Sequence, residues 1–192
     1  MKKVCHVISG YYRIDARVFQ RQCKSLQKDG YEVSVLTNDG KPDEIIDGIV
    51  FYSCDKFYQS RIKILFFATK QFYQKAKSID ADVYQLHSPE LLPLGLKLKK
   101  LGKKVVYDAH EDLPRHIQEK EWLPKIVRKP LSIIIEWFMI YSLSKFDFII
   151  TPHSHVLLDL ENKVKNIELI ANFPLVKMST NFSFEEYTDR NN

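Results

Sequence analysis

Titratable residues follow two neighbouring apolar segments of the chain. His87 and Glu90 come directly after the apolar segment 81–86, and the run Asp-Ala-His-Glu-Asp at 108–112 comes directly after the segment 103–107. If both segments are parallel strands, their carboxyl ends lie at the same edge of a sheet, which is where open α/β sheets bind ligands. The sequence therefore predicts a ligand site built from both clusters.

The first cluster has a functional and a structural interpretation. A histidine directly after a strand can face a cleft or can be hydrogen-bonded within a tight turn. We expect His87 to face a cleft, because loops at this edge of a sheet often carry ligand contacts. Glu90 would lie in the first turn of a helix, where the helix dipole favours a carboxylate whether or not a ligand is bound.

The second cluster is denser, and its chemistry is open. The residues Asp108, His110, Glu111 and Asp112 could form a metal site, an acid–base site or a clamp for sugar hydroxyl groups. A metal site would need a further ligand at a familiar spacing, and the local sequence offers none. A hydroxyl clamp is the simpler interpretation, and we expect at least one carboxylate of the four residues only to close the turn.

The loop after the first apolar segment is a third candidate. Gly10 is its one glycine, so the loop lacks the G-x-G-x-x-G pattern of a dinucleotide site. Gly10 could allow a ligand phosphate to approach the backbone, with Arg13 and Arg17 as anion contacts. Alternatively, Asp15 caps the following helix and both arginines are only solvated.

Length and composition are those of a globular protein. The 192 residues suit one domain with a full core, and a net charge of +5 would suit an anionic partner without requiring one. The three cysteines stand far apart, which predicts a reduced, cytoplasmic chain without disulfides. The apolar stretch 132–150 contains Glu136, Lys145 and Asp147, so no transmembrane helix is expected.

Short apolar segments alternate with helical patterns, which predicts an α/β fold: a Rossmann-like, doubly wound parallel sheet of about seven strands. Strands are expected at 3–8, 31–37, 49–53, 81–86, 103–107, 147–151 and 167–171. Helices are expected at 16–28, 57–79, 89–101 (with Ser88 as the N-cap), 122–144 and 154–160. Residues 38–48 should form a loop. The domain should cover residues 1–175, with 176–192 as a polar tail or the start of a linker.

The segment 115–128 is both basic and aromatic, with Lys120, Trp122 and Lys125 before a long apolar run. It could lie on an anionic bilayer with the tryptophan at the interface, which would be a peripheral membrane contact. The alternative is a helix that packs on the core and has a solvated basic face.

Several stretches together resemble the N-terminal half of a GT-B glycosyltransferase, and most of all the retaining glycosyltransferase family 4. The stretches are DVYQLHSPELLPLGLKLKKLGKKVVYDAHEDLP at 82–114, ARVFQRQCKSLQKDGYEVSVLT at 16–37, FDFIITPHS at 146–154 and IELIANFPL at 167–175. The resemblance implies a single GT-B half that mainly holds the acceptor. A second Rossmann-like domain, absent from this chain, would hold the nucleotide-sugar donor.

The resemblance also implies roles for particular residues. His87 matches a catalytic histidine beside the transferred sugar, and His110 with Glu111 and Asp112 matches a loop on the acceptor side, to which we add Glu90. The loop 9–17 matches a loop near the donor phosphates, although the family often has more glycines there. The resemblance implies that no metal and no other cofactor is needed.

The first hypothesis is therefore an acceptor-binding half that works with a nucleotide-sugar donor and a glycan or lipid-linked acceptor in bacterial surface polysaccharide synthesis. The chain alone is expected to be inactive and to bind no nucleic acid. A second hypothesis is a non-enzymatic interaction subunit of a split transferase. A third is a stand-alone nucleotide-binding Rossmann-type protein, against which the lone Gly10 argues.

Overall fold

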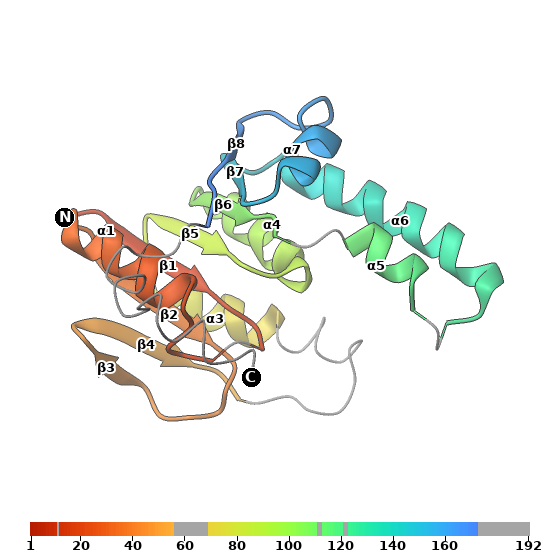
Figure 1. Ribbon diagram of the computed structural model, residues 1–192. Coiled ribbons are helices and arrows are strands. Elements are labelled where there is room, and N and C mark those ends of the chain that lie inside the picture. Colours follow the sequence, from red (N-terminus) through yellow and green to blue (C-terminus); the bar gives the residue numbers. More distant parts are fainter. Residues whose placement is uncertain (11, 56–68, 111–112, 121–122, 173–192) are drawn as a thin grey trace, which may run out of the picture.

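The structure is a computed structural model that describes residues 1–10, 12–55, 69–110, 113–120 and 123–172. Within these residues the chain forms one eight-stranded sheet with helices on both faces (Figure 1). The strands are β1 (Lys3–Val7), β2 (Glu32–Thr37), β3 (Glu44–Ile46), β4 (Ile49–Ser53), β5 (Val83–Leu86), β6 (Lys104–Asp108), β7 (Phe148–Thr151) and β8 (Ile167–Leu169). This confirms the predicted α/β class.

The strand order creates a switch point in the middle of the sheet. The order is β3-β4-β2-β1-β5-β6-β7-β8, and every neighbouring pair is parallel except β3 with β4. From β1 the chain builds outward to β4 on one side, then returns and builds from β5 to β8 on the other side. The crevice at the carboxyl ends of β1 and β5 is the place where such folds bind ligands.

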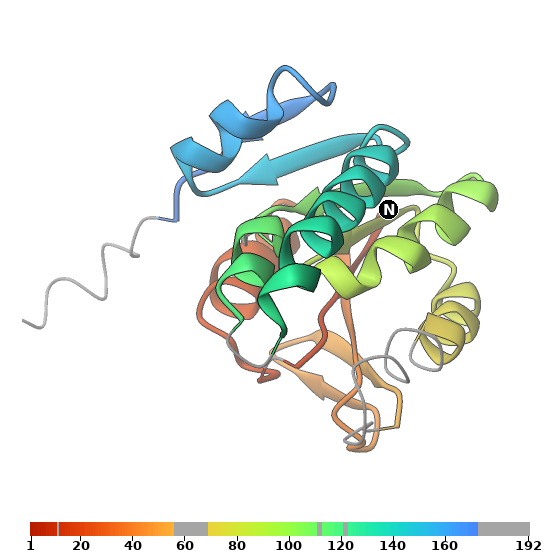
Figure 2. The ribbon, with the colours of Figure 1, turned by 90° about the vertical axis from the view of Figure 1, so that its right-hand side faces the viewer.

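The helices divide between the two faces of the sheet. They are η1 (Val18–Cys23), α1 (Lys24–Lys28), α3 (Thr69–Ile79), η3 (Pro89–Leu91), α4 (Leu92–Lys100), α5 (Leu113–Gln118), α6 (Lys125–Leu143) and α7 (Ser154–Leu160). Apolar side chains of α3, α4, α6 and α7 pack with Val7, Leu86 and other residues of one face. Figure 2 shows α3, α4 and α6 side by side there. The opposite face packs Val18 and Phe19 of η1 against Val33 and Val35 of β2.

The strand β3 was not predicted from the sequence. Residues 44–46 were expected to be loop, but they pair antiparallel with β4. Asp47 and Gly48 form the connection with φ values of 50° and 78°. A two-residue Asp-Gly loop with both φ values positive is a favoured hairpin turn, because its twist matches that of the strands. The Asp-Gly pair between Ile46 and Ile49 was the signal that the prediction overlooked.

The helices also differ from the prediction in detail. The helix expected at 16–28 begins with the π-helix η1 and continues as α1. The short helix α5 was not predicted, and the N-terminal part of the helix expected at 57–79 lies outside the described residues, as does the tail 176–192. Ser88 is the N-cap residue, as predicted, but its side chain makes no capping hydrogen bond.

The cysteines and the helix lengths agree with the sequence analysis. All three cysteines are free and buried, which agrees with the prediction of a chain without disulfides. No helix among the described residues is long and apolar enough to cross a bilayer.

Candidate functional site

The candidate site lies at the carboxyl ends of β1, β5 and β6, beside the switch point. His6 pairs in register with Gln85, and Leu86 pairs with Tyr107, so His87 and Asp108 follow side by side on neighbouring strands. The backbone N–H of His87 donates to Val7 O at 3.1 Å, which extends the pairing of β5 with β1 by one residue. Side chains in register on parallel strands share a face. The fold thus brings His6, His87 and Asp108 together.

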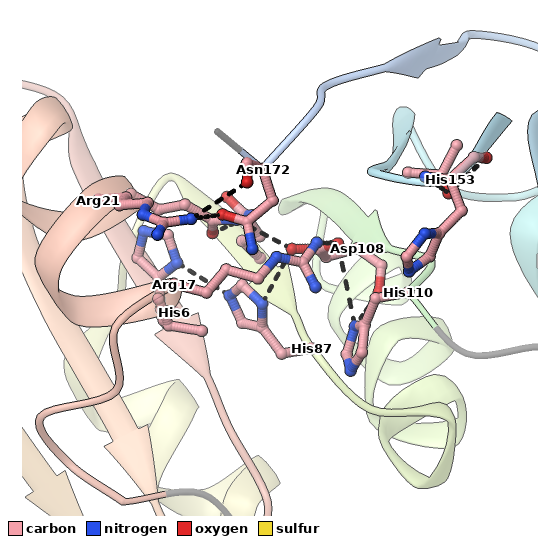
Figure 3. Close-up of polar contacts among 12 residues, drawn as sticks. His6, Arg17, Arg21, His87, Asp108, His110, His153 and Asn172 are labelled. Carbon is pink, nitrogen blue, oxygen red and sulfur yellow. Dashed lines mark hydrogen bonds and ion pairs between the residues drawn. The ribbon is translucent and has the colours of Figure 1, made fainter. Parts of the chain in front are cut away.

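These three side chains form a chain of polar contacts inside the protein (Figure 3). The Nδ1 atom of His6 lies 3.0 Å from Nε2 of His87, and Nδ1 of His87 lies 3.2 Å from Oδ2 of Asp108. The two imidazole rings are stacked at 18° with their centroids 5.2 Å apart. All three side chains are at most 1% exposed, so solvent cannot replace these contacts.

The Asp108 carboxylate determines which ring nitrogens carry hydrogen. The Nδ1 atom of His87 lies 3.2 Å from the carboxylate without good hydrogen-bond geometry, and a carboxylate, which only accepts, favours the tautomer with the hydrogen on that Nδ1. In the neutral ring, Nε2 of His87 is then an acceptor and takes the Nδ1–H of His6. This leaves the lone pair of His6 Nε2 pointing away from both partners, and that buried atom has no partner among the described residues.

The helix η1 supplies the remaining partners of Asp108. Arg17 Nη2 donates to Oδ1 and Gln22 Nε2 donates to Oδ2 at 3.0 Å. The Gln22 oxygen in turn accepts from Gln85 Nε2 at 2.9 Å. An α-helix turns residues i and i+5 about 140° from each other, whereas i→i+5 bonding brings them nearer to alignment. The π-helix therefore lets Arg17 and Gln22 reach one carboxylate.

This arrangement shifts the pKa values of all three buried groups. Burial alone raises the pKa of the Asp108 carboxyl, but contacts with His87, Arg17 and Gln22 outweigh it and hold the pKa at about 2. Burial lowers the pKa of His87 below its ordinary 6.5, although Asp108 opposes the shift. Burial, and then the neighbouring His87, lowers the pKa of His6 well below 6.5. The carboxylate is therefore charged and both histidines are neutral near pH 7.

The edge around this buried group is partly open to solvent. His110 follows β6 with its side chain 15% exposed, and its Nδ1 lies 3.1 Å from the carbonyl oxygen of Asp108. A carbonyl oxygen accepts, so Nδ1 of His110 carries the hydrogen and Nε2 carries the lone pair. The exposed His153 extends beside it from the end of β7 (Figure 3). Arg21 donates to Asn172, which ties the chain after β8 to η1.

Two of the predicted site residues meet at this edge directly. His87 and His110 both contact Asp108, and Arg17 also belongs to the group. Glu90 is half-buried in the first turn of η3. Glu111 and Asp112 lie outside the described residues, so their predicted role stays a prediction.

The residues of the loop 9–17 make different kinds of contact. Gly10 has a φ of 78°, and a Cβ there would meet none of the described atoms within 4 Å, while its backbone N–H donates to Asn38 Oδ1 at 3.3 Å. Arg13 is 6% exposed and turns away from the site: it binds Asp39 through Nε at 2.6 Å and Nη2 at 2.9 Å, and Glu44 through Nη1 at 2.6 Å. Its predicted role as a phosphate contact stays a prediction, although Asp39 and Glu44 already balance its charge. Asp15 caps the helix through the N–H groups of Arg17 and Val18, as the structural alternative proposed.

Sequence reasoning missed His6, Gln22 and Gln85, and it read Asp108 only as a member of a cluster. A polar residue inside an otherwise apolar strand was the available signal for His6 and for Gln85. Such a residue in a doubly covered strand must be satisfied by a buried partner. The described residues contain no group of three or more histidine, cysteine or carboxylate side chains that could hold a metal ion.

The fold and this edge define one half of a GT-B transferase, and comparison with known families agrees. The family described as Glycosyltransferase Family 4 matches residues 16–173, so the chain belongs to that family. A search of curated proteins finds none that matches the chain.

Solved structures show the same fold at low sequence identity. Sucrose-phosphate synthase from Thermosynechococcus elongatus has a TM-score of 0.68 at 14% identity, over 93% of this chain and 50% of that chain. Apo UGT2 from Phytolacca americana has a TM-score of 0.63 at 8% identity, over 99% of this chain and 55% of that one. This chain therefore spans about half the length of each of these two structures.

Proposed function

We propose that this chain is the acceptor-side half of a retaining glycosyltransferase. The full enzyme would transfer a sugar from a nucleotide-sugar donor to a glycan or lipid-linked saccharide in bacterial surface polysaccharide synthesis. The observation that carries the proposal is the cluster of His87, Asp108 and His110 at the carboxyl edge beside the switch point. Membership of Glycosyltransferase Family 4 supplies the reaction class.

A second domain would hold most of the donor. In support, a similar structure from E. coli, at a TM-score of 0.54 and 10% identity, is described as bound with UDP-2-fluoro glucose, and this chain covers 41% of it. Within this chain, the backbone at Gly10 and the guanidinium of Arg17 are the groups that we propose for the donor phosphates. Since Asp108 already balances the charge of Arg17, the arginine would orient a phosphate through its remaining N–H donors.

The two histidines would have different tasks. Both nitrogens of His87 face protein groups and the ring is 1% exposed, so we propose that His87 acts as a positioning residue through Asp108. His110 is 15% exposed at this edge, and we propose that its imidazole contacts a hydroxyl group of the acceptor. Glu111, Asp112 and Glu90 remain proposed acceptor contacts. Glycan hydroxyls are donors, and carboxylates and neutral imidazole nitrogen are suitable acceptors for them.

Titration of the ¹⁵N-labelled protein with short glycans tests this placement. Amide shifts should concentrate at residues 8–10, 87–88 and 108–110, and not at the opposite ends of the strands. The variant His110→Ala should bind glycan about fivefold more weakly, because a hydrogen bond is worth about 1 kcal/mol. Lys77→Ala is the control, since that exposed residue lies in the last turn of α3, before β5 begins, at the opposite ends of the strands. Unchanged affinity in His110→Ala would contradict the assigned role.

A further inference from the structure

The helix α6 carries an apolar face that the described part of the chain leaves exposed. Six large apolar side chains of α6 are exposed, more than on any other element, and Ile126 and Trp137 reach 86% and 69%. The opposite side of the helix packs on the core through Ser132, Met139, Ser142 and Leu143. The exposed apolar face consists of Ile126, Ile133, Ile134, Trp137 and Tyr141.

The spacing of these residues makes the face one continuous strip. From Ile126 the steps of seven, four and four residues lead to Ile133, Trp137 and Tyr141, which places them along one side of an α-helix. Trp137 and Tyr141 stack at 11° with their ring centroids 5.9 Å apart. The strip is about 22 Å long at 1.5 Å per residue. Figures 1 and 2 show α6 and α5 at one side of the molecule, beyond α4.

Basic residues border this strip at both ends. Lys125 and Lys129 are exposed at the beginning of α6, and Lys145 is exposed just past its end, 5.7 Å from the centroid of the Tyr141 ring. The helix contains one carboxylate, Glu136, and Lys163 neutralises it at 2.8 Å. The rim of the apolar strip is therefore positively charged.

We propose that α6 docks on an anionic lipid bilayer through this face. Isoleucine side chains would enter the boundary between headgroups and acyl chains, the aromatic pair would lie at headgroup level, and the lysines would contact lipid phosphates. A second copy of the chain fits less well. Since both ends of the strip are basic, a two-fold contact would put lysines of one copy against lysines of the other in either helix direction. Anionic lipid complements both the apolar strip and its basic rim.

This inference does not rest on the proposed function, because docking requires no sugar and no donor domain. If the bilayer docking and the proposed function are both correct, the acceptor should be a lipid-linked saccharide rather than a free glycan. The helix α5 begins at Leu113, three residues after His110, and it packs on α6. The membrane contact of α6 would therefore lie close to the proposed acceptor residues along the chain.

Vesicle co-sedimentation of the full chain tests the proposal. Vesicles of phosphatidylcholine with about one third phosphatidylglycerol should bind at least about tenfold more tightly than pure phosphatidylcholine, and added salt should weaken the binding. The double variant Ile134→Ser/Trp137→Ser and the double variant Lys125→Glu/Lys129→Glu should each lose at least about tenfold. Leu158→Ser on α7 and Lys77→Glu on α3 are matched controls at exposed positions and should bind as the parent does.

A fluorescence readout checks the same contact without disturbing the face. The chain has two tryptophans, so the variant Trp122→Phe makes Trp137 the sole emitter. Its emission should shift to shorter wavelength when anionic vesicles are added. The proposal is overturned if the parent does not bind vesicles. It is also overturned if Ile134→Ser/Trp137→Ser binds them as tightly as the parent does. Self-association that Ile134→Ser/Trp137→Ser abolishes in a chain that binds no vesicles overturns it too, since the face would then be an interface between copies.

Discussion

Replacing Asp108 by alanine should lower the free energy of unfolding by about 3 kcal/mol. The Asp108 side chain is fully buried and contacts His87, Arg17 and Gln22. Its removal leaves the guanidinium of Arg17 and the Nδ1–H of His87 without their acceptor. Breaking one partner of a buried pair costs about 3–5 kcal/mol, and the lower figure applies because Arg17 is 19% exposed and can be partly rehydrated.

Urea unfolding of the variant and the parent at pH 7.5 measures this loss. Asp108→Asn keeps an oxygen for His87 and Gln22 but removes the charge, so its loss should be smaller, at about 1–2 kcal/mol. Asp159→Ala replaces an exposed carboxylate on α7 and should change the stability by less than about 0.5 kcal/mol. If Asp108→Ala cost no more than that control, the buried network would not be organised by its carboxylate.

Stability should fall steeply as the pH drops below 6.5. The pKa values of His6 and His87 are both lowered in the folded chain by burial, so the unfolded chain takes up protons first. A group whose folded pKa is depressed contributes stability above its unfolded pKa and loses it as the pH falls. Each histidine should therefore contribute a slope of up to about 1.4 kcal/mol per pH unit below pH 6.5.

The carboxylate adds no slope in this window. Since the folded pKa of Asp108 is about 2, its contribution is complete above about pH 5 and is lost only below that. Urea unfolding at pH 7.5, 6.5, 5.5 and 5.0 (about half-unit to one-unit steps across the histidine range) gives the profile. His6→Gln should roughly halve the slope, whereas His153→Gln, at an exposed position, should leave it unchanged. A flat profile, or stability that rises with acidity, would contradict neutral buried histidines.

The sequence was informative wherever one local pattern determined the outcome. The alternation of apolar segments and helical patterns predicted the parallel sheet, and parallel strands were enough to place His87 beside the cluster that starts at Asp108. The hairpin at Asp47-Gly48 was equally local and was overlooked.

What could not be predicted depended on partners far away in the sequence. Arg13 was assigned to a ligand, whereas its partners in the structure, Asp39 and Glu44, lie 26 and 31 residues further on. His6 and Asp108 are linked through His87 by strand register, which periodicity does not determine. The π-helix η1 lets Arg17 and Gln22 reach Asp108, which lies 91 and 86 residues further on, so no local pattern around η1 indicated this arrangement.

The bilayer contact and the buried network belong to two separate proposals. The network holds the ends of β1, β5 and β6 and the helix η1 in one arrangement, which presents His110 at the edge. The apolar face of α6 would bring that edge to a membrane where a lipid-linked acceptor resides. Either proposal can fail without the other. The buried network is tested by unfolding and glycan binding, whereas the bilayer contact is tested by vesicle binding.

Saturation-transfer NMR on this chain tests the central claim most directly. One sample would hold a panel of nucleotide sugars and a second would hold short, lipid-free glycans. An acceptor-side half should show transfer to glycan protons and none to nucleotide protons, because the donor is held mainly by the second domain. Strong transfer to a nucleotide, with none to any glycan, would contradict the account and would favour a stand-alone nucleotide-binding protein of the same fold.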